Sequence, residues 1–338
     1  MSTPILDIRD LRVTFPTDDG LVQAVNGMDL IVQRGETVGI VGESGSGKTV
    51  TSQTLMGLMK GTSARVSGQI LFEGTDLVPL SEHEMRPYRG RKVGMIFQDP
   101  LSAMHPFYTV GRQIAEAYRV HNRVSAKAAK AQAIEMLNRV GIPDPVSRYD
   151  AYPHEFSGGM RQRAMIAMAL ICEPELLIAD EPTTALDVTV QAQILDLISS
   201  LQAETGSAVI FVTHDLGVVA EVCQRVVVMY GGQCVEEADV REAFFQTAHP
   251  YTKGLLASMP SMADETGRLI PIPGFPPSLL NLPGGCLFAD RCPVSHLVSD
   301  DRCRTERPAL SGSGSHRARC HLSEGGIPHA AALQEVVR

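Results

Sequence analysis

One short stretch, GESGSGKT (42–49), constrains this chain more than any other. It matches the pattern G-x-x-x-x-G-K-[ST], follows the apolar run ETVGIV (36–41) and opens a segment of helical character. A strand, a glycine-rich turn and a helix in this order form a phosphate-binding loop, because converging backbone N–H groups and the helix N-terminus attract phosphate oxygens. The stretch therefore predicts a nucleotide site within an α/β fold.

Two side chains of this loop have specific expected roles. Lys48 would contact the β- and γ-phosphates, and the Thr49 hydroxyl would bind Mg²⁺. The alternative is a glycine-rich turn that matches the pattern by chance. The predicted nucleotide contacts are Gly42, Glu43, Ser44, Gly45, Ser46, Gly47, Lys48, Thr49 and Val50.

The rest of the chain alternates strand and helix signals. LRVTF (11–15) and MDLIV (28–32) have the period-2 pattern of half-buried antiparallel strands. LLIAD (176–180) and AVIFVTHD (208–215) are continuous apolar runs, typical of strands buried on both faces. Helical patterns follow Ser125, a candidate N-cap, and occupy VTVQAQILDLISSLQAETG (188–206). We predict an α/β core with a mainly parallel sheet and an antiparallel β subdomain.

Composition divides the chain into two expected parts. Residues 1–248 form the α/β domain, and its segment from about 101 to 156 has helical signals with few strand signals, which indicates a helical insertion. Residues 249–338 form a loop-rich extension that contains the proline-rich PIPGFPPSLLNLPGG (271–285), expected to lie extended on the main domain. SGSGS (311–315) predicts a flexible loop.

Net charge and hydropathy limit which partners and which cellular compartment are expected for the chain. The 338 residues carry a net charge of −8, which disfavours a nucleic-acid partner. No stretch of 18 consecutive apolar residues predicts a membrane span, and the N-terminus has no signal-peptide pattern. We expect a cytosolic protein whose thiols stay reduced.

Two further motifs carry chemistry. Asp180 and Glu181 end the LLIAD strand, where Asp180 would hold Mg²⁺ and Glu181 would polarise an attacking water; the alternative is a solvated pair of acids. FSGGMRQR (156–163) places Ser157, Gly158 and Gly159 before a helix, where exposed N–H groups could form a second anion site. Taken alone, this stretch is better explained as a serine N-cap followed by a flexible turn.

These motifs, in this order, resemble the ATPase subunit of ABC transporters. The resemblance covers residues 1 to about 245 and implies ATP and Mg²⁺ as ligands. It implies that Gln98 in FQDP contacts Mg²⁺, that Asp187 in TALD communicates across an ATPase dimer, and that His214 in VTHD contacts the γ-phosphate. It also places Phe15 against adenine. The alternatives are a capping glutamine, an N-cap aspartate, a loop histidine and a core aromatic.

One departure from the usual family motif narrows the resemblance to a subfamily. The usual leucine-serine-glycine-glycine-glutamine signature has Phe156 first and Met160 last in this chain. This variant, HPYTKGLLASMP (249–260), the proline-rich segment and the cysteine tail resemble dipeptide and oligopeptide importers. Nickel importers share much of the layout, so the cargo stays open between the two.

The resemblance also implies partners. Ser157, Gly158 and Gly159 would cap ATP bound to a second, homologous but non-identical ATPase subunit, and two transmembrane permeases and an extracytoplasmic binding protein would complete the importer. The chain would then sit peripherally on the cytoplasmic face of the membrane. The rivals are a soluble ABC ATPase acting on DNA or ribosomes, and a metal-binding regulatory module fused to an inactive ATPase. The intact Lys48 and Glu181 argue against the second.

Four of the seven cysteines gather in the tail. Cys286, Cys292, Cys303 and Cys320 are separated by five, ten and sixteen residues, without the close pairs of structural zinc sites. A cytosolic setting disfavours disulfides, which leaves zinc, unligated thiols or a [4Fe–4S] cluster held by four thiolates. The family resemblance implies the cluster, with a structural or redox-sensing role.

Overall fold

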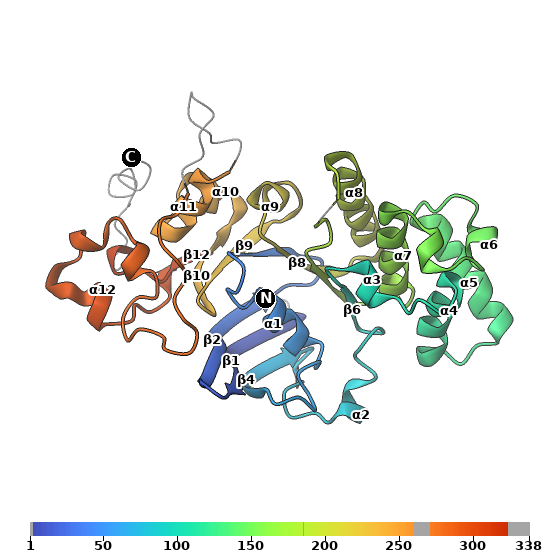
Figure 1. The fold of residues 1–338 in the computed structure, drawn as a ribbon, viewed down its shortest axis with the longest axis horizontal. Coiled ribbons are helices and arrows are strands. Elements are labelled where there is room, and N and C mark those ends of the chain that lie inside the picture. The colour runs from blue at the N-terminus through green and yellow to red at the C-terminus, as the bar shows by residue number, and fades with distance from the viewer. Residues whose placement is uncertain (1–2, 185, 260–270, 324–338) are drawn as a thin grey trace. The chain divides into compact units, whose positions relative to one another are not determined.

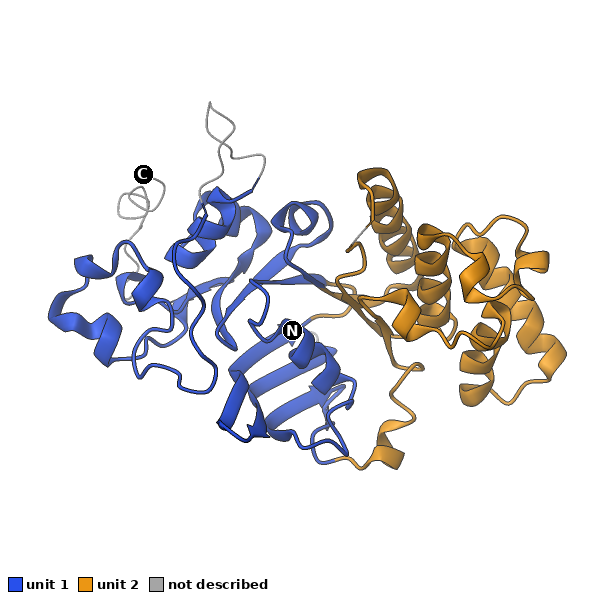
Figure 2. Cartoon of the chain, in the orientation of Figure 1, with its two compact units in different colours: residues 1–32, 37–79, 212–338 blue, residues 33–36, 80–211 orange. Residues whose placement is uncertain are grey.

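The computed structural model describes residues 3–184, 186–259 and 271–323, and the chain forms two compact units (Figure 1, Figure 2). Unit 1 consists of Met1–Val32, Thr37–Pro79 and Val212–Arg338. Unit 2 consists of Gln33–Glu36 and Leu80–Phe211. Both units combine strands with helices, as the sequence predicted.

Unit 1 contains a four-stranded antiparallel sheet in the order β2-β1-β4-β5. Leu11 and Val13 are fully buried, as their alternation predicted, and so are Leu6 and Ile8. The buried positions change from even-numbered to odd-numbered residues because the register of β1 shifts between Ile8 and Leu11. At this shift Asp10 takes a left-handed φ of 43°. The strands are β1 (Leu6–Thr17), β2 (Gly20–Val32), β4 (Arg65–Phe72) and β5 (Thr75–Asp76).

A second sheet in unit 1 carries strands in the order β11-β12-β10-β9-β3. Strand β3 (Thr37–Val41) pairs in parallel with β9 (Arg225–Tyr230), whereas β10 (Gln233–Asp239) pairs antiparallel with β9. The sheet is therefore mixed: the predicted parallel pairing holds for β3 and β9, whereas the described pairs β9–β10, β10–β12 and β11–β12 are antiparallel. The helices of this part are α1 (Lys48–Leu55), α9 (Leu216–Val222), α10 (Val240–Phe245) and α11 (Pro250–Ala257).

The C-terminal extension completes this sheet. Its strands β11 (Ser311–Ser313) and β12 (His316–Ala318) form a hairpin, and β12 pairs with β10. The loop predicted at 311–315 is thus wrong in its first three residues, because the glycine-rich stretch pairs with a neighbouring strand. The proline-rich segment forms no helix or strand from 271 to 285 and is joined to β2 by a hydrogen bond from Gln23 N to Leu279 O of 2.9 Å.

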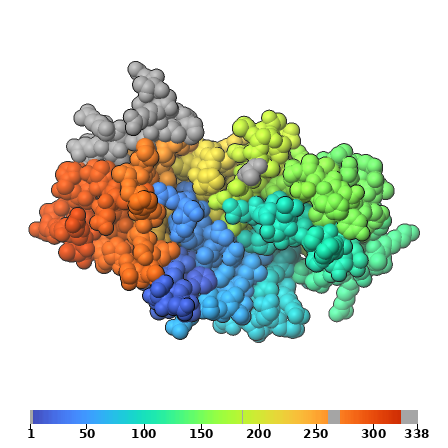
Figure 3. Space-filling model, in the orientation of Figure 1, coloured from blue at the N-terminus to red at the C-terminus, as the bar shows by residue number. Residues whose placement is uncertain are grey.

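The remainder of the extension is built from short turns of helix, namely η3 (Ala289–Arg291), η4 (Ser295–Leu297), η5 (Ser299–Asp301), α12 (Arg302–Thr305) and η6 (His321–Ser323). In the space-filling view its orange surface adjoins the blue surface of the first strands (Figure 3). The sequence predicted this loop-rich character.

Unit 2 contains the parallel pair β6 (Val93–Ile96) and β7 (Leu176–Asp180), with β8 (Ala208–Thr213) next to β7. Strand β8 crosses the boundary between the units. All five residues of β7 are buried, as its continuous apolar sequence predicted. The helices are α2 (Glu82–Met85), α3 (Pro100–Ala103), α4 (Val110–His121), α5 (Ala126–Arg139), α6 (Pro145–Arg148), η1 (Pro153–Glu155), α7 (Gly158–Leu170) and α8 (Val188–Thr205).

The helical insertion begins its main helix where the sequence predicted. Ser125 caps α5 by accepting a 3.2 Å hydrogen bond from Ala128 N, and Gly141 follows the helix with a left-handed φ of 74°. Within the described ranges, no helix combines the length and the apolar character that crossing a membrane requires.

Candidate functional site

The phosphate-binding loop lies between β3 and α1, as predicted. Its glycines are required by close backbone approaches. A Cβ atom on Gly42 would lie 2.2 Å from Met229 O, and one on Gly47 would lie 2.4 Å from Ala24 O. Gly47 also caps α1 with a left-handed φ of 99°. This fold therefore requires glycine at positions 42 and 47, whereas a Cβ on Gly45 would meet nothing within 4 Å.

Lys48 is the first residue of α1 and is 5% exposed. Its ammonium group donates to Gly42 O at 2.7 Å and to Glu43 O at 3.0 Å, so it lies folded over the loop. The buried Ser46 hydroxyl has no hydrogen-bond partner in the described part of the chain. An ammonium at the loop and an unsatisfied hydroxyl are groups that a phosphate oxygen can bind.

Glu43 is held by two residues from the C-terminal part of unit 1. Its backbone N–H donates to the Tyr251 hydroxyl at 2.9 Å. Its carboxylate accepts a bidentate pair of bonds from the Arg291 guanidinium, at 2.7 and 3.0 Å. The second residue of the phosphate loop is thus fixed through both its backbone and its side chain.

The sequence HPY at 249–251 explains how Tyr251 reaches the loop. His249 caps α11, and its Nδ1 accepts a 3.1 Å bond from Tyr251 N; Pro250 occupies the first turn. The fully buried Glu236 of β10 accepts from Ala248 N at 2.7 Å and from His249 N at 3.0 Å. This buried carboxylate fixes the start of α11 and so positions the tyrosine.

In unit 2 the carboxylate pair stands at the end of β7. Asp180 is 2% exposed. Glu181 has a left-handed φ of 47°, which is unusual for a residue with a side chain. Its Oε2 accepts from Gln98 Nε2 at 2.9 Å and from the Thr184 hydroxyl at 2.9 Å. The structure therefore joins two predicted residues, and Gln98 does not act as a helix cap.

Ser157 and Asp187 both cap helices. The Ser157 hydroxyl accepts from Met160 N at 3.3 Å at the start of α7, and Asp187 Oδ1 accepts from Val190 N at 3.0 Å at the start of α8. Within this chain, both side chains therefore act as helix N-caps, which is the alternative that the sequence left open for them. Ser157 and Gly158 are exposed, and a Cβ on Gly158 would meet nothing within 4 Å.

Two further predicted residues belong to unit 1. Phe15 lies half-buried on β1 opposite Val22, and His214 is exposed directly after β8. The other members of the predicted set divide between the units, with the phosphate loop in unit 1 and Gln98, Ser157, Asp180, Glu181 and Asp187 in unit 2.

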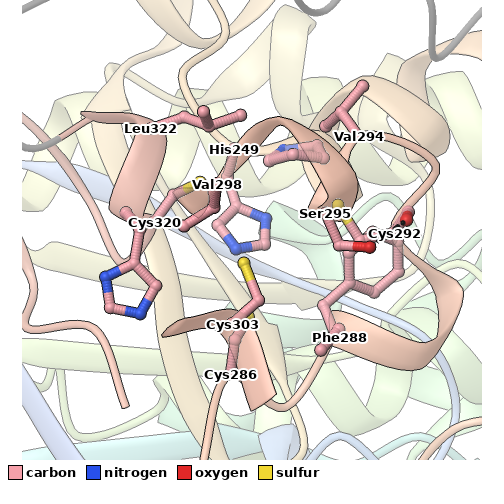
Figure 4. A pocket seen from close by; sticks show the side chains of 13 residues that line it. His249, Cys286, Phe288, Cys292, Val294, Ser295, Val298, Cys303, Cys320 and Leu322 are labelled. Carbon is pink, nitrogen blue, oxygen red and sulfur yellow. Dashed lines mark hydrogen bonds between the residues drawn. The ribbon is translucent and has the colours of Figure 1, made fainter. Parts of the chain in front are cut away.

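Cys286, Cys292, Cys303 and Cys320 line one pocket of the extension together with His249 and Phe288 (Figure 4). Burial raises the pKa of the Cys292 and Cys320 thiols to about 12 and that of Cys303 to about 11, and it also raises the pKa of Cys286. Such thiols stay protonated at neutral pH unless a cation takes the proton's place.

The pocket does not have the geometry of a site for one ion. Among residues 3–184, 186–259 and 271–323, no three His, Cys, Asp or Glu side chains are grouped so that they could hold a metal ion. All four cysteines nevertheless line the same pocket.

Sequence reasoning missed the side chains that support the site. Arg291, Tyr251 and Thr184 were not singled out, although each contacts a predicted site residue. For Tyr251 a signal existed in the HPY sequence, and for Arg291 in its place directly before Cys292. Thr184 follows Glu181 by one turn, which is a weaker signal.

The phosphate loop, the carboxylate pair after β7 and the surrounding fold define the class of ATP-binding cassettes. Residues 25–184 match the ABC transporter family, and residues 235–297 match the family described as the oligopeptide/dipeptide transporter C-terminal region. The chain superimposes on the ATP-binding cassette MJ0796 in a dimeric post-hydrolysis state bound to ADP and Pi. In that comparison the TM-score is 0.63 and the identity is 27%, over 70% of this chain and 99% of the other.

Relatives that match along almost the whole chain show to which branch of the ATP-binding cassettes it belongs. The chain is 52% identical to the dipeptide transport ATP-binding protein DppD of Bacillus subtilis (strain 168), over 96% of this chain and 97% of that protein. It is 50% identical to the oligopeptide transport ATP-binding protein OppD of the same organism, over 96% of this chain and 91% of that protein. The chain therefore belongs to the ATP-binding proteins of ABC transporters, in the branch that carries the oligopeptide/dipeptide transporter C-terminal region.

Proposed function

We propose that this chain is the ATP-hydrolysing subunit of an ABC importer that takes up di- and oligopeptides. The observation that carries the proposal is the likeness to dipeptide and oligopeptide transport ATP-binding proteins along almost the whole chain, extension included. That likeness favours peptides over nickel as cargo, and it favours a transporter over an ATPase that acts on DNA or ribosomes. ATPase residues would occupy 1–248, with a helical subdomain at about 101–156, and the extension 249–338.

The residues of the loop would bind the nucleotide. Lys48 would leave the carbonyl groups of Gly42 and Glu43 to contact the β- and γ-phosphates, while the backbone N–H groups of the loop cradle them. Phe15 would stack on adenine. Thr49, Gln98 and Asp180 supply hydroxyl, amide and carboxylate oxygens, which is the donor set that Mg²⁺ prefers.

Glu181 would orient the attacking water, and His214 would contact the γ-phosphate. Gln98 and Thr184 both donate to Glu181 Oε2, which supports a fixed direction for the carboxylate that would orient the water. Ser157, Gly158 and Gly159 would cap the ATP of a second, homologous ATPase subunit, and Asp187 would act across that interface. The open space at Gly158 supports this role.

We further propose that the four cysteines hold a [4Fe–4S] cluster. Four thiols around one buried pocket match the donor set of such a cluster, which binds one thiolate at each iron. The cluster would hold a loop-rich extension together or sense its redox state.

Iron analysis tests the cluster. The full chain, purified anaerobically from iron-replete cells, is expected to contain about four iron and four sulfide, and Cys303→Ser is expected to lower both. Cys234→Ser is the matched control, because Cys234 is a buried cysteine of β10 outside the pocket. Stoichiometric zinc, or no metal at all, would rule the cluster out.

Two permeases, the second ATPase and an extracytoplasmic binding protein would complete the importer, with this chain peripheral on the cytoplasmic face. The segment after Gln98 is the proposed permease contact, because it exposes large apolar side chains: Leu101 is 57% exposed and Phe107 is 81% exposed.

Uptake tests the whole proposal. Cells that lack this chain should lose uptake of labelled di- or oligopeptides and keep nickel uptake, and a plasmid copy should restore the loss. Peptide uptake that is unaffected, or co-purification of the chain with ribosomes or DNA in place of membrane proteins, would contradict it. Phe107→Asp should reduce co-purification with the permeases, while the exposed Phe245→Asp of α10 is the control.

A further inference from the structure

Every N–H donor of the Arg291 guanidinium is directed at a hydrogen-bond acceptor. The guanidinium carries five N–H donors. They are directed at the two carboxylate oxygens of Glu43 at 2.7 and 3.0 Å, the Tyr230 hydroxyl at 3.2 Å, Pro273 O at 2.8 Å and Ile272 O at 3.4 Å. The side chain is 5% exposed, whereas that of Glu43 is 27% exposed. A buried cation from the extension thus holds an acid of the phosphate loop.

The same segment builds the cysteine pocket. Arg291 ends η3 and is followed directly by Cys292, and Cys286 N donates to Cys303 O at 2.8 Å just before this turn. Cys286 and Cys292 pack against the buried cluster that contains Val41, the last residue of β3. The phosphate loop and the cysteine pocket therefore share a core as well as an ion pair.

The contact between Arg291 and Glu43 is relevant to nucleotide binding because Glu43 carries a negative charge. A carboxylate in the second position of the loop lies close to where a triphosphate binds, and like charges repel. Arg291 neutralises the carboxylate and directs it away along a bidentate contact. The contact also holds the loop in one conformation, so that less entropy is lost on binding.

We propose that Arg291 is a positioning residue through which the C-terminal extension sets the affinity of the phosphate loop for ATP. It neutralises Glu43 and holds the loop ready for the phosphates. The inference rests on the proposed role of residues 42–50 as the nucleotide-binding loop. Arg291 does not touch the nucleotide; it acts through Glu43.

The test is a double-mutant cycle on the purified full chain, with Mg²⁺ and a fluorescent ATP analogue as the probe. Arg291→Gln removes the charge and leaves Glu43 uncompensated, so Kd is expected to rise about tenfold. Glu43→Gln in the Arg291→Gln background removes the repulsion and should recover most of that loss. Arg291→Lys keeps the charge without the fork, so its Kd should lie between those of wild type and Arg291→Gln.

Electrostatics also predicts a salt dependence. The excess Kd of Arg291→Gln over wild type should shrink as ionic strength rises, because salt screens the exposed part of Glu43. The matched control is Arg302→Gln, which breaks an exposed ion pair with Glu306 in the same extension, 2.9 Å long, and should leave Kd unchanged.

Several outcomes would overturn the proposal. If Arg291→Gln and Arg291→Lys both bind with wild-type affinity, Arg291 has no part in nucleotide binding. If Glu43→Gln rescues nothing, the effect of Arg291 is structural and not electrostatic. Lys48→Ala separates this from the proposed site itself: if Lys48→Ala binds the nucleotide as tightly as wild type, residues 42–50 are not the nucleotide-binding loop.

Discussion

Gln98 Nε2 donates a 2.9 Å hydrogen bond to Glu181 Oε2, joining two residues that are 83 positions apart in the chain. The same carboxylate oxygen accepts from Thr184, and the Glu181 backbone is left-handed. Two side chains and a strained backbone thus determine where the carboxylate points. A group that orients water needs such support, because a small displacement of a catalytic group lowers the rate strongly.

The first prediction concerns Glu181→Gln. The amide is close in shape to the carboxylate and can still accept from Gln98, so ATP binding should be kept. The basic oxygen is lost, and single-turnover cleavage in the assembled complex should fall by about a hundredfold or more. A variant that cleaves ATP at most of the wild-type rate would remove Glu181 from this role.

Thr184 offers a subtler test of the same site. Thr184→Val keeps the shape but removes one hydrogen bond to Glu181, a contribution of about 1 kcal/mol or about fivefold in rate. We expect kcat to fall by that factor while KM for ATP stays constant. Thr184→Ser, which keeps the hydroxyl, should behave like wild type, and equal rates for the Val and Ser variants would contradict the positioning role.

The elements of the site could be predicted from local patterns. Continuous apolar runs gave β3 and β7, and glycine spacing gave the phosphate loop, because each depends on residues that are neighbours in the chain. The Gln98–Glu181 bond was not derivable from spacing. Its partners come from different elements of unit 2, and only the family resemblance placed them in one site.

The contacts of the C-terminal extension were even harder to predict from the sequence than the Gln98–Glu181 bond. The proline-rich segment and the gathered cysteines were visible in the sequence. The pairing of β12 with β10 was not, since His316–Ala318 is too short to show a strand pattern. Arg291 reaches Glu43 across 248 positions. Nothing in periodicity or composition encodes a contact of such long range.

Assembly gives a third prediction. Because half of each proposed ATP site comes from a second subunit, the purified chain alone should hydrolyse ATP slowly, and the partner ATPase with the permeases should raise kcat. Gly158→Glu should abolish this increase, since a carboxylate at the open signature glycine would clash with the partner's ATP. An isolated chain that sedimentation shows to be monomeric and that matches the activity of the complex would refute the composite site.

The last prediction concerns pH and the hairpin β11–β12. His316 Nε2 lies 2.8 Å from Glu236 Oε1, with Asp239 and Glu242 nearby. The hydrogen bond and charge of Glu236, followed by the charges of the other two acids, raise the pKa of His316 above its ordinary value of 6.5. The folded state therefore binds the proton more tightly than the unfolded chain does.

The sign of the pH effect follows from this. The stabilisation by His316 should be fully present below pH 6.5 and lost as pH rises through the higher pKa of the folded state. His316→Gln cannot be protonated, so the difference in melting temperature between wild type and variant should be largest near pH 6 and shrink toward pH 8.5. Replacing the exposed His83 of α2 by Gln controls for a general loss of histidine. A difference that is constant across this range, or that grows with pH, would show that His316 does not act through its charge.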